Sequence, residues 1–454
     1  MKRLRNKKGL LEALVVIGLI LLIPLFFTMR TTAEQNAAQN TSAPPLPTVV
    51  INAPAGSNAL APKQPSACTF PLAQITPTDT PPENYTFSEP KVVLTSVDNR
   101  YNIVNWLPDN QQVLITQDLY DITKNENGKY LRQSIELYNP NTGEQQIYAI
   151  RYHTESPPLW QEKLNAVIYP HMNFLGIDEN AHKLKFTRQI WVSYGNPDTA
   201  QMLSDNLPQF PHAVKPGGDE MIYLSDKKIS KRDKSLKEIT SNPFDLNQWD
   251  YAKTRRNETP VSYNMDWQPN TSLIFLHSNG GMQEGGGYTF ILDTDTGRIC
   301  ELNLDGWAVQ AHWSSDGHYL AFIKATISSS PVNTTDLVVL DTISGKTYTV
   351  EVTPKELEGK HYVDDFVWAP DNYHLLVVAS VVPFHGTKQE GASGLHLVDF
   401  ISGQSVNILS AYKFYANSSQ SNLAWSFDGS KLLARCPTME EERVCYIDVQ
   451  KVKE

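Results

Sequence analysis

The chain has 454 residues, of which 41% are hydrophobic, and a formal net charge of −10 at pH 7. This length allows one large domain with an appended tail, or several smaller domains. Residues 1–30 contain six basic residues and one acid, a net charge of +5, so the remainder carries −15. Because binding to nucleic-acid phosphates needs a basic patch, the acidic body excludes nucleic acid as an expected partner.

The first thirty residues have the pattern of a membrane segment. Basic residues dominate positions 1–9, and the run from Ala13 to Met29 contains no charge. We therefore predict a cytoplasmic tail over 1–9 and a transmembrane helix or signal anchor over 10–29, which makes the membrane a partner of that segment. The basic flank stays in the cytoplasm by the positive-inside rule, so the rest is extracytoplasmic. The alternative is a signal peptide cleaved near Thr31-Thr32-Ala33, which yields a secreted protein.

Residues 30–90 differ in composition from the rest, because they are rich in Pro, Ala, Thr, Ser and Asn. Such a segment buries too little apolar surface to fold, and its prolines keep it extended. We predict a disordered stalk over 30–90 that carries a folded domain over 91–454.

A phrase made of a Trp, a polar turn and an apolar run recurs along that domain, as in AHWSSDGHYLAFI at 311–323. The anchoring residues are Trp106, Trp160, Trp267, Trp313, Trp368 and Trp425, with Val214 in a weaker copy. Their spacings are 54, 54, 53, 46, 55 and 57 residues. Self-similarity at a period near 50 residues indicates the blades of a propeller.

Each repeat reads as a four-stranded antiparallel unit. The phrase gives one hairpin around a turn such as FDGS, and a second hairpin turns at a Gly, as in LVVLDTISGKTYTVEV at 337–352. The last repeat lacks one strand, and KVVLTSV at 91–97 belongs to no repeat of its own. The sequence therefore predicts an all-β propeller, with seven blades and an N-terminal strand that closes the ring. Six blades is the alternative, because the unit at Val214 is weak.

These phrases resemble the repeats of TolB-type propellers, in which a Trp-Ser-Pro-Asp-Gly-like core occurs once per blade. The resemblance covers 92–449 and is strongest at Trp313, Trp368 and Trp425. The WD-type repeat is related, but its Trp-Asp and Gly-His dipeptides are missing here. The resemblance implies the propeller fold and binding of proteins in the cell envelope, and it implies no reaction.

The four cysteines suit an exported chain, in which an even number permits disulfides. Cys436 and Cys445 flank a short connection between two strand-like runs, so a hairpin could place them opposite each other. Cys68 and Cys300 would be the remaining pair. Buried free thiols are the competing interpretation.

The short turns should lie on one face of the propeller and the long connections on the other. Variable loops on a rigid scaffold usually carry function. The long-loop face supplies aromatic, acidic and imidazole side chains suited to a protein or glycan partner. The candidate binding residues are Tyr120, Trp249, Tyr251, His361, Tyr362, Asp364, Asp365, His385 and Tyr415.

Motifs of catalysis are weak throughout. GASGL at 391–395 is not a nucleophile elbow, and NGGMQEGGG at 279–287 lacks the Lys of a phosphate loop. No spacing among the eleven histidines demands a metal. His312 occupies a position where other repeats vary, which indicates that it is tolerated rather than required. We predict a non-enzymatic binding scaffold without cofactor. The alternatives are a metal-dependent polysaccharide lyase or hydrolase of propeller fold, and a sensor, which the short cytoplasmic tail disfavours.

Overall fold

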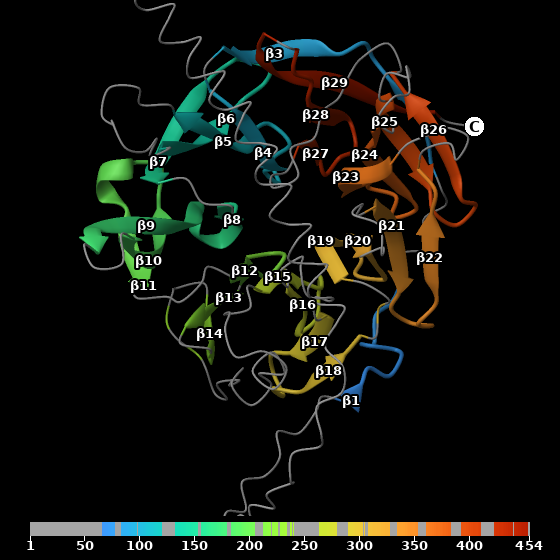
Figure 1. Cartoon of the computed structure of the whole chain (residues 1–454), viewed down its shortest axis with the longest axis horizontal. Helices are drawn as coiled ribbons and strands as arrows, with labels where there is room; N and C mark the ends of the chain where they lie inside the picture. The colour runs from blue at the N-terminus through green and yellow to red at the C-terminus, as the bar shows by residue number, and fades with distance from the viewer. Residues whose placement is uncertain are drawn as a thin grey trace, which may run out of the picture. The chain divides into compact units, whose positions relative to one another are not determined.

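Seven β-sheets surround a common axis in the computed structural model (Figure 1). The structure describes residues 66–77, 83–97, 99–119, 132–152, 156–178, 183–204, 212–218, 220–225, 228–233, 237, 239, 263–278, 289–302, 304, 307–326, 334–352, 360–382, 392–409, 422–438 and 440–452. The prediction of seven blades rather than six is confirmed. No helix in these residues is long and apolar enough to span a membrane. Residues 10–29 lie outside them, so the transmembrane helix stays a prediction.

Each blade begins with its innermost strand and continues outward in chain order. Blade 1 contains β4 (Tyr101–Trp106), β5 (Val113–Leu119), β6 (Arg132–Tyr138) and β7 (Gln145–Tyr152). Blade 2 contains β8 (Leu159–Gln161), β9 (Ala166–Asp178), β10 (Lys183–Ser193) and β11 (Gln201–Ser204), with the short 3-10 helices η1 (Glu162–Leu164) and η2 (Pro197–Thr199). Blade 3 contains β12 (His212–Val214), β13 (Glu220–Ser225) and β14 (Lys228–Asp233). Blade 4 contains β15 (Tyr263–Trp267), β16 (Leu273–Ser278), β17 (Thr289–Asp293) and β18 (Ile299–Glu301), and it also pairs with β1 (Ser66–Ala67).

The remaining blades follow the same order. Blade 5 contains β19 (Trp307–Trp313), β20 (Tyr319–Thr326), β21 (Thr334–Asp341) and β22 (Thr347–Val350). Blade 6 contains β23 (Lys360–Trp368), β24 (His374–Val382), β25 (Ala392–Asp399) and β26 (Gln404–Ile408). Blade 7 contains β27 (Leu423–Trp425), β28 (Lys431–Arg435) and β29 (Glu442–Val452), and it is completed by β2 (Asn84–Phe87) and β3 (Lys91–Ser96).

The turns after the Trp anchors use residues that tolerate a left-handed backbone. Asn110, Asn270 and Asn372 have φ values of 54°, 58° and 61°, and Gly317 and Gly429 have 77° and 78°. Gly has no Cβ to clash in this region, and Asn tolerates it better than most residues. The turn that the sequence predicts after each Trp, such as FDGS, therefore matches the observed backbone.

The N-terminal strand closes the ring, as predicted. β3 pairs with the first half of β29, with Ser96 opposite Glu442 and Lys91 opposite Tyr446. β2 continues along the second half, with Phe87 opposite Val449. The closing segment is therefore longer than predicted. It starts at Asn84, and it joins the first and last parts of the chain in one sheet.

The Trp anchors pack between neighbouring blades, and three of them also donate a hydrogen bond to the neighbouring blade. The indole Nε1 of Trp106 donates to Ala424 O at 3.0 Å, Trp313 Nε1 to Asp266 O at 3.1 Å, and Trp368 Nε1 to His312 O at 2.8 Å. Each acceptor directly precedes the Trp of the previous blade in the ring. A large apolar ring with one polar group suits this role, because it packs and bonds at once.

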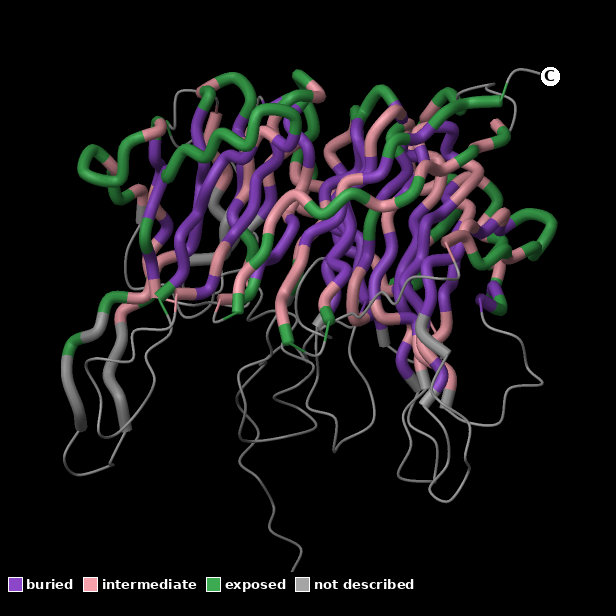
Figure 2. The backbone as a smooth tube through the Cα atoms, turned by 90° about the horizontal axis from the view of Figure 1, so that it is seen from above, coloured by how far each residue is buried: buried purple, intermediate pink, exposed green. Residues whose placement is uncertain are grey.

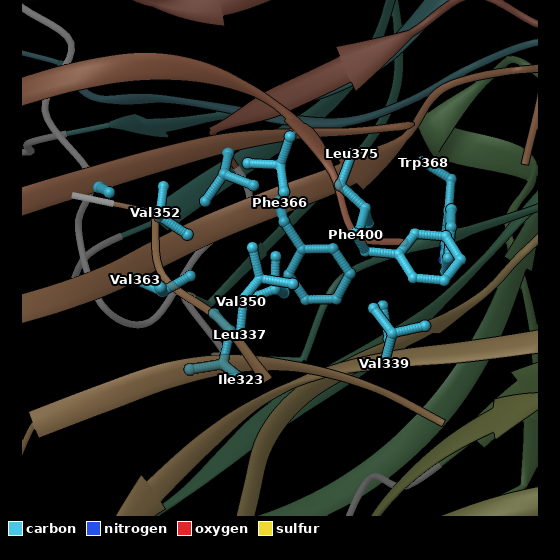
Figure 3. Close-up of a cluster of buried hydrophobic side chains, with 14 residues drawn as sticks. Ile323, Leu337, Val339, Val350, Val352, Val363, Phe366, Trp368, Leu375 and Phe400 are labelled. Atoms are coloured by element: carbon cyan, nitrogen blue, oxygen red, sulfur yellow. The ribbon is translucent and has the colours of Figure 1, made fainter. Parts of the chain in front are cut away.

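The hydrophobic core lies between blades rather than within one. The cluster in Figure 3 joins side chains of blades 5 and 6, among them Leu337, Phe366 and Leu375. At its edge Trp368 and Phe400 meet edge to face, with ring centroids 5.7 Å apart. Because every blade shares such an interface with its neighbours, no single sheet could bury its own faces.

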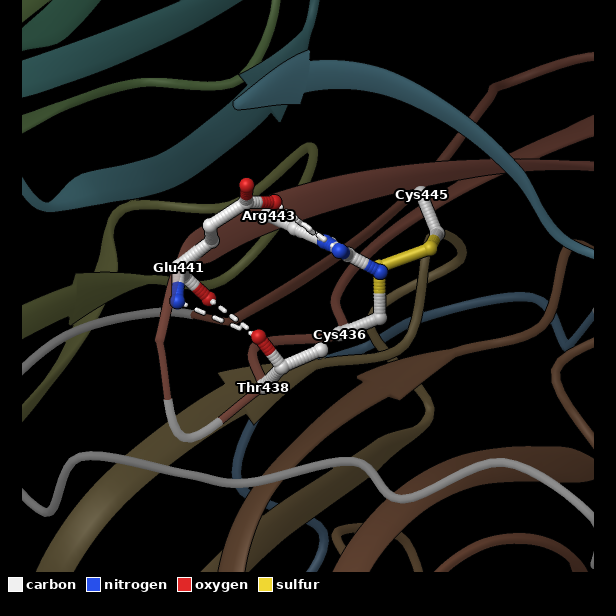
Figure 4. Close-up of a disulfide and its surroundings, with 5 residues drawn as sticks. All are labelled: Cys436, Thr438, Glu441, Arg443 and Cys445. Atoms are coloured by element: carbon white, nitrogen blue, oxygen red, sulfur yellow. Dashed lines mark hydrogen bonds and ion pairs between the residues drawn. A yellow bond between two sulfur atoms is a disulfide. The ribbon is translucent and has the colours of Figure 1, made fainter. Parts of the chain in front are cut away.

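Both cysteine pairs form disulfides. Cys436 and Cys445 join β28 to β29, and Cys436 N donates to Arg443 O at 3.0 Å beside the bridge (Figure 4). The short connection between them is ordered by Thr438, whose Oγ1 accepts from Glu441 N at 3.1 Å. Cys68 and Cys300 form the second bridge, across 232 residues of sequence. The described residues contain no free cysteine.

The second disulfide fastens an N-terminal strap, which we define as residues 66–77 and 83–90. The strap begins at blade 4, where Cys68 N donates to Glu301 O at 3.0 Å. It bonds blade 5 through Leu72 N and Thr342 O at 2.9 Å, and blade 6 through Glu83 N and Asp371 Oδ2 at 3.1 Å.

These positions fall inside the range predicted as stalk, so the structure moves the start of the propeller domain back from residue 91 to residue 66. The physical reason is that a proline-rich segment can still be ordered when a disulfide and hydrogen bonds to a preformed sheet hold it.

The strap contact can be tested at two equivalent glycines. Gly345 has a φ of 77°, and a Cβ there would lie 2.7 Å from Phe70 Cδ2, whereas Gly403, with φ of 74°, has open space. Both alanine variants strain the backbone, by about 1 kcal/mol. We expect Gly345→Ala to lower the free energy of unfolding by about 1 kcal/mol more than Gly403→Ala, because Phe70 must move. Denaturant unfolding measures the difference, which should vanish in a Phe70→Ala background. A difference that persists there would exclude the strap as its cause.

Candidate functional site

The two faces of the ring are built differently. Figure 2 shows short exposed turns along one face, the tight-turn face. Turns of adjacent blades bond to each other there: Asp428 N donates to Asn110 Oδ1 at 3.2 Å, and Ser315 N donates to Asn372 Oδ1 at 2.8 Å. The connections on the opposite, long-loop face lie largely outside the described residues. On the described part of the tight-turn face, turns of adjacent blades are thus hydrogen-bonded to each other.

The candidate binding residues divide into two groups. Tyr120, Trp249, Tyr251, His385 and Tyr415 lie outside the described residues. His361, Tyr362, Asp364 and Asp365 lie on β23, the innermost strand of blade 6, and not in a loop as the sequence suggested. His361 and Tyr362 are half-buried near the start of that strand, whereas Asp365 is 1% exposed.

Asp365 belongs to a group of side chains on adjacent innermost strands, the axial polar cluster, formed by Asp266, Gln310, His312, Asp365 and Asn422. Gln310 Nε2 lies 2.7 Å from Asp365 Oδ1 and 3.1 Å from His312 Nε2. His312 Nδ1 lies 3.4 Å from Asp266 Oδ2. Asp365 Oδ2 accepts the backbone N–H of Asn422. The cluster therefore joins blades 4, 5, 6 and 7 around the axis.

Local backbone irregularities place these side chains. The pairing of β19 with β20 shifts register between Ala308 and Gln310, and that of β23 with β24 shifts between Val363 and Asp365. A bulge of this kind inserts one residue and re-aims the side chains that follow it. Gln310 and Asp365, each directly after a shift, consequently meet.

The cluster continues outward into blade 7. Arg435, only 5% exposed, donates from one terminal nitrogen to Asn422 Oδ1 at 2.8 Å and from the other to Glu442 Oε2 at 2.8 Å. A buried guanidinium is costly unless it is paired and hydrogen-bonded. The two terminal nitrogens have partners, whereas the buried Nε has none among the described residues.

Burial and close charges shift the proton affinities in the cluster. Burial is the largest effect at Asp266 and Asp365 and raises the pKa of each carboxyl group. At His312 burial would lower the pKa, but the contact with Asp266 and the negative charge of Asp365 outweigh it and raise the pKa above its usual value. The imidazole of His312 remains partly open, with 47% of its side-chain surface accessible.

Asp364 lies beside the cluster and has a more strongly shifted carboxyl group. Burial raises its pKa to about 6, against the hydrogen bond from Ser380 Oγ at 2.7 Å and in the same sense as the neighbouring charge of Asp365. A carboxyl group of this kind is partly protonated near neutral pH. Groups with such perturbed proton affinity concentrate at functional sites, although structural networks also produce them.

A second buried polar network joins blades 1 and 2. Arg151, 2% exposed, donates to Gln133 Oε1 at 2.9 and 2.6 Å and to Pro170 O at 3.0 Å. Gln133 Nε2 in turn donates to Asp118 Oδ1 at 2.8 Å. Burial lowers the pKa of Arg151 to about 9. These contacts join β6 and β7 of blade 1 to β9 of blade 2. We therefore interpret the network as a structural link between the two blades.

The chemistry available in the described part of the chain is acid–base and hydrogen-bonding chemistry. The described residues hold no group of three or more His, Cys, Asp or Glu side chains placed to bind a metal. His277 is buried and its Nδ1 contacts Ala308 O at 3.0 Å. His312 contacts both Gln310 and Asp266 in the axial polar cluster, and the interpretation that it is tolerated rather than required stays a prediction.

The fold and cluster define the class of this chain as a seven-bladed β-propeller with a closing N-terminal strand. No protein-family model matches the sequence, and a search of curated proteins found no match. Structural neighbours include the β-propeller domain of the trilobed protease from Pyrococcus furiosus, with 11% identity, coverage of 80% of this chain and 99% of that one, and a TM-score of 0.48.

Two further structural neighbours are an oligogalacturonate lyase and a TolB protein. Oligogalacturonate lyase from Vibrio parahaemolyticus shows 10% identity, covers 82% of this chain and 98% of that one, and has a TM-score of 0.45. TolB from Acinetobacter baumannii shows 11% identity over 73% and 78% of the two chains, with a TM-score of 0.37. TolB-like propellers are thus among the neighbours, and similarity at this level does not select an activity.

Proposed function

We propose that the chain is a non-enzymatic extracytoplasmic scaffold, tethered to the membrane by residues 10–29, that binds a protein partner in the cell envelope through its long-loop face. The observation that carries the proposal is the asymmetry of the two faces. The turns of the tight-turn face bond to each other and to the strap, as Asn372 does with Ser315 and Asp371 with Glu83. Polar groups that are already hydrogen-bonded within the protein are less available to bind a partner. Long connections on a rigid ring, in contrast, suit recognition.

Two features support the environment and the location of the site. Two disulfides in a chain with four cysteines suit an oxidising compartment, as an exported domain would meet. His361 and Tyr362 are half-buried near the beginning of β23, which is its long-loop end, because β23 leads into the tight turn after Trp368. An aromatic ring and an imidazole there are suitable contacts at the inner edge of the binding face.

Site-specific photo-crosslinking in intact cells tests the proposal. A benzoylphenylalanine at Tyr362 reports the long-loop face, and one at Phe427, an aromatic residue that is 61% exposed in a tight turn, serves as the matched control. We expect a discrete adduct of defined mass from position 362 and none from position 427. An adduct from 427 alone would place the partner on the wrong face, and no adduct from either would contradict a protein partner.

The second candidate function is a polysaccharide lyase or hydrolase, and it is favoured by the pair of Asp266 and His312. A carboxylate beside an accessible imidazole is a common arrangement for general acid–base catalysis. Turnover of a polysaccharide by the wild type, lost in His312→Gln with unchanged stability, would replace the scaffold proposal with this one.

A further inference from the structure

We propose that Gln310 couples the protonation of His312 to that of Asp365, so that the two groups take up protons together as the pH falls. This inference goes beyond the binding function and is independent of it. It concerns a proton-sensitive switch at the joints between blades 4, 5 and 6.

The switch follows from one atom that has two partners. Gln310 Nε2 contacts both His312 Nε2, at 3.1 Å, and Asp365 Oδ1, at 2.7 Å. An amide NH2 group only donates hydrogen bonds, and an amide oxygen only accepts them. If the NH2 group occupies this position, both neighbours must be acceptors. If the amide oxygen occupies it, both neighbours must be donors.

In the first state the NH2 group faces both partners. His312 Nε2 must then be an acceptor, so the imidazole is neutral and carries its proton on Nδ1. Nδ1 lies 3.4 Å from Asp266 Oδ2, which is an ion-pair distance. Asp365 must also be an acceptor and is ionised, and it accepts the backbone N–H groups of Phe366 and Asn422 as well. In this state both contacts of the Gln310 amide nitrogen are made to acceptors.

Protonation of His312 breaks this arrangement, because an Nε2–H would face the NH2 group of Gln310. Rotation of the amide by half a turn removes the conflict, since the amide oxygen then accepts from His312. That oxygen would now face Asp365 Oδ1, however, and two acceptors repel unless Asp365 also carries a proton. Protonation of His312 alone would leave the amide oxygen against an ionised, buried Asp365, which is costly. The attraction between a protonated His312 and an ionised Asp365 acts in the opposite sense, and the coupling requires the hydrogen-bond mismatch to outweigh it. The second state is therefore doubly protonated.

The surroundings are consistent with two accessible states. Among the described residues, the titratable groups that face His312 are Asp266 from β15, His277 from β16 and Asp365 from β23. Asp365 is additionally next to Asp364. Burial lowers the pKa of His277 to about 4, so it stays neutral over the range considered. Burial also raises the pKa of Asp365, which moves its proton uptake toward the range in which an imidazole titrates.

The two states differ in charge. In the first, Asp266 and Asp365 are negative and His312 is neutral. In the second, Asp365 is neutral and the charges of Asp266 and His312 cancel. Acidification thus removes the net negative charge of these three groups and rearranges a hydrogen bond between blades 5 and 6.

The steepness of the His312 titration tests the proposal. The full chain in detergent solution, with isotope-labelled histidine, is followed by NMR against pH, and His312→Asn assigns the resonance. We expect a Hill coefficient near 2 in the wild type, and near 1 in Gln310→Met, because only coupled sites titrate together. Gln268→Met is the matched control, since Gln268 Nε2 joins blades 4 and 5 through Gly317 O at 2.8 Å without a titratable partner. It should leave the steepness of His312 unchanged.

A second variant keeps the test decisive if Gln310→Met fails to fold. Asp365→Asn has an amide that can still donate to the oxygen of Gln310 but takes up no proton, so His312 should again titrate with a Hill coefficient near 1. A wild-type coefficient near 1 would overturn the proposal. So would a steep titration that persists in either folded variant.

Discussion

Replacing Cys68 and Cys300 with alanine should lower the free energy of unfolding by about 5 kcal/mol, and replacing Cys436 and Cys445 should lower it by about 2–3 kcal/mol. The bridges span 232 and 9 residues of sequence. A cross-link restricts the unfolded chain more when it closes a longer loop, so its loss raises the entropy of the unfolded state more. Both disulfides belong to the same ring, so their contributions to the free energy of unfolding can be compared within one protein.

Equilibrium denaturation of the full chain measures both effects. The strap adds a second consequence for the first pair, because Cys68 is the only covalent link between the strap and blade 4 in the described residues. Proteolysis within residues 66–77 should therefore become faster in Cys68→Ala/Cys300→Ala and stay unchanged in Cys436→Ala/Cys445→Ala. Equal losses of stability from the two pairs would show that loop length in the unfolded state does not determine their contributions.

The sequence determines the ring because a repeated phrase repeats a physical requirement. An interface between blades needs a large apolar side chain, and Trp106, Trp313 and Trp368 add the same hydrogen bond to the neighbouring blade. The missing strand of the last repeat predicted the closure at β29, since a blade with three strands leaves an unpaired edge. These features could be read without coordinates.

The strap could not be read in this way. Its residues follow no period, and their composition matches that of a disordered linker. Its order comes from contacts 232 residues away in sequence, at Cys300, and from a neighbouring turn at Thr342. Such contacts depend on a ring that must already exist, so no local pattern reports them.

The repeats contain a sequence pattern that indicates the axial polar cluster. The pattern plays no part in predicting the number of blades. The residue three positions before the Trp is polar in four consecutive blades: Asn264, Gln310, Asp365 and Asn422. Aligning the repeats at that position would have selected three members of the cluster: Gln310, Asp365 and Asn422. The partners within the cluster could not be assigned, because the bulges in β19 and β23 decide which side chains meet.

Trp106 lies where the ring closes, and its loss should have the largest effect of any single anchor. It is 1% exposed, packs against blade 7 and donates to Ala424 O, itself buried, at 3.0 Å. We expect Trp106→Ala to lower the free energy of unfolding by about 3–5 kcal/mol through the cavity that it leaves. Trp106→Phe keeps most of the packing and removes the donor, so it should cost about 1–3 kcal/mol for an unsatisfied buried carbonyl.

Trp267→Phe is the matched control for the second variant. Trp267 is 2% exposed, but its Nε1 donates to Thr271 O in its own partly exposed turn, at 3.0 Å. Water can replace that bond, so the control should cost less than about 1 kcal/mol. Hydrogen exchange separates a local loss from an opening of the ring. If Trp106 holds the seam, its variants accelerate exchange in β4 and β27 together, on both sides of the joint between the first and last blades. Equal costs for the two phenylalanine variants would mean that the bond across the seam adds nothing to the packing, and closure would then rest on β2 and β3 alone.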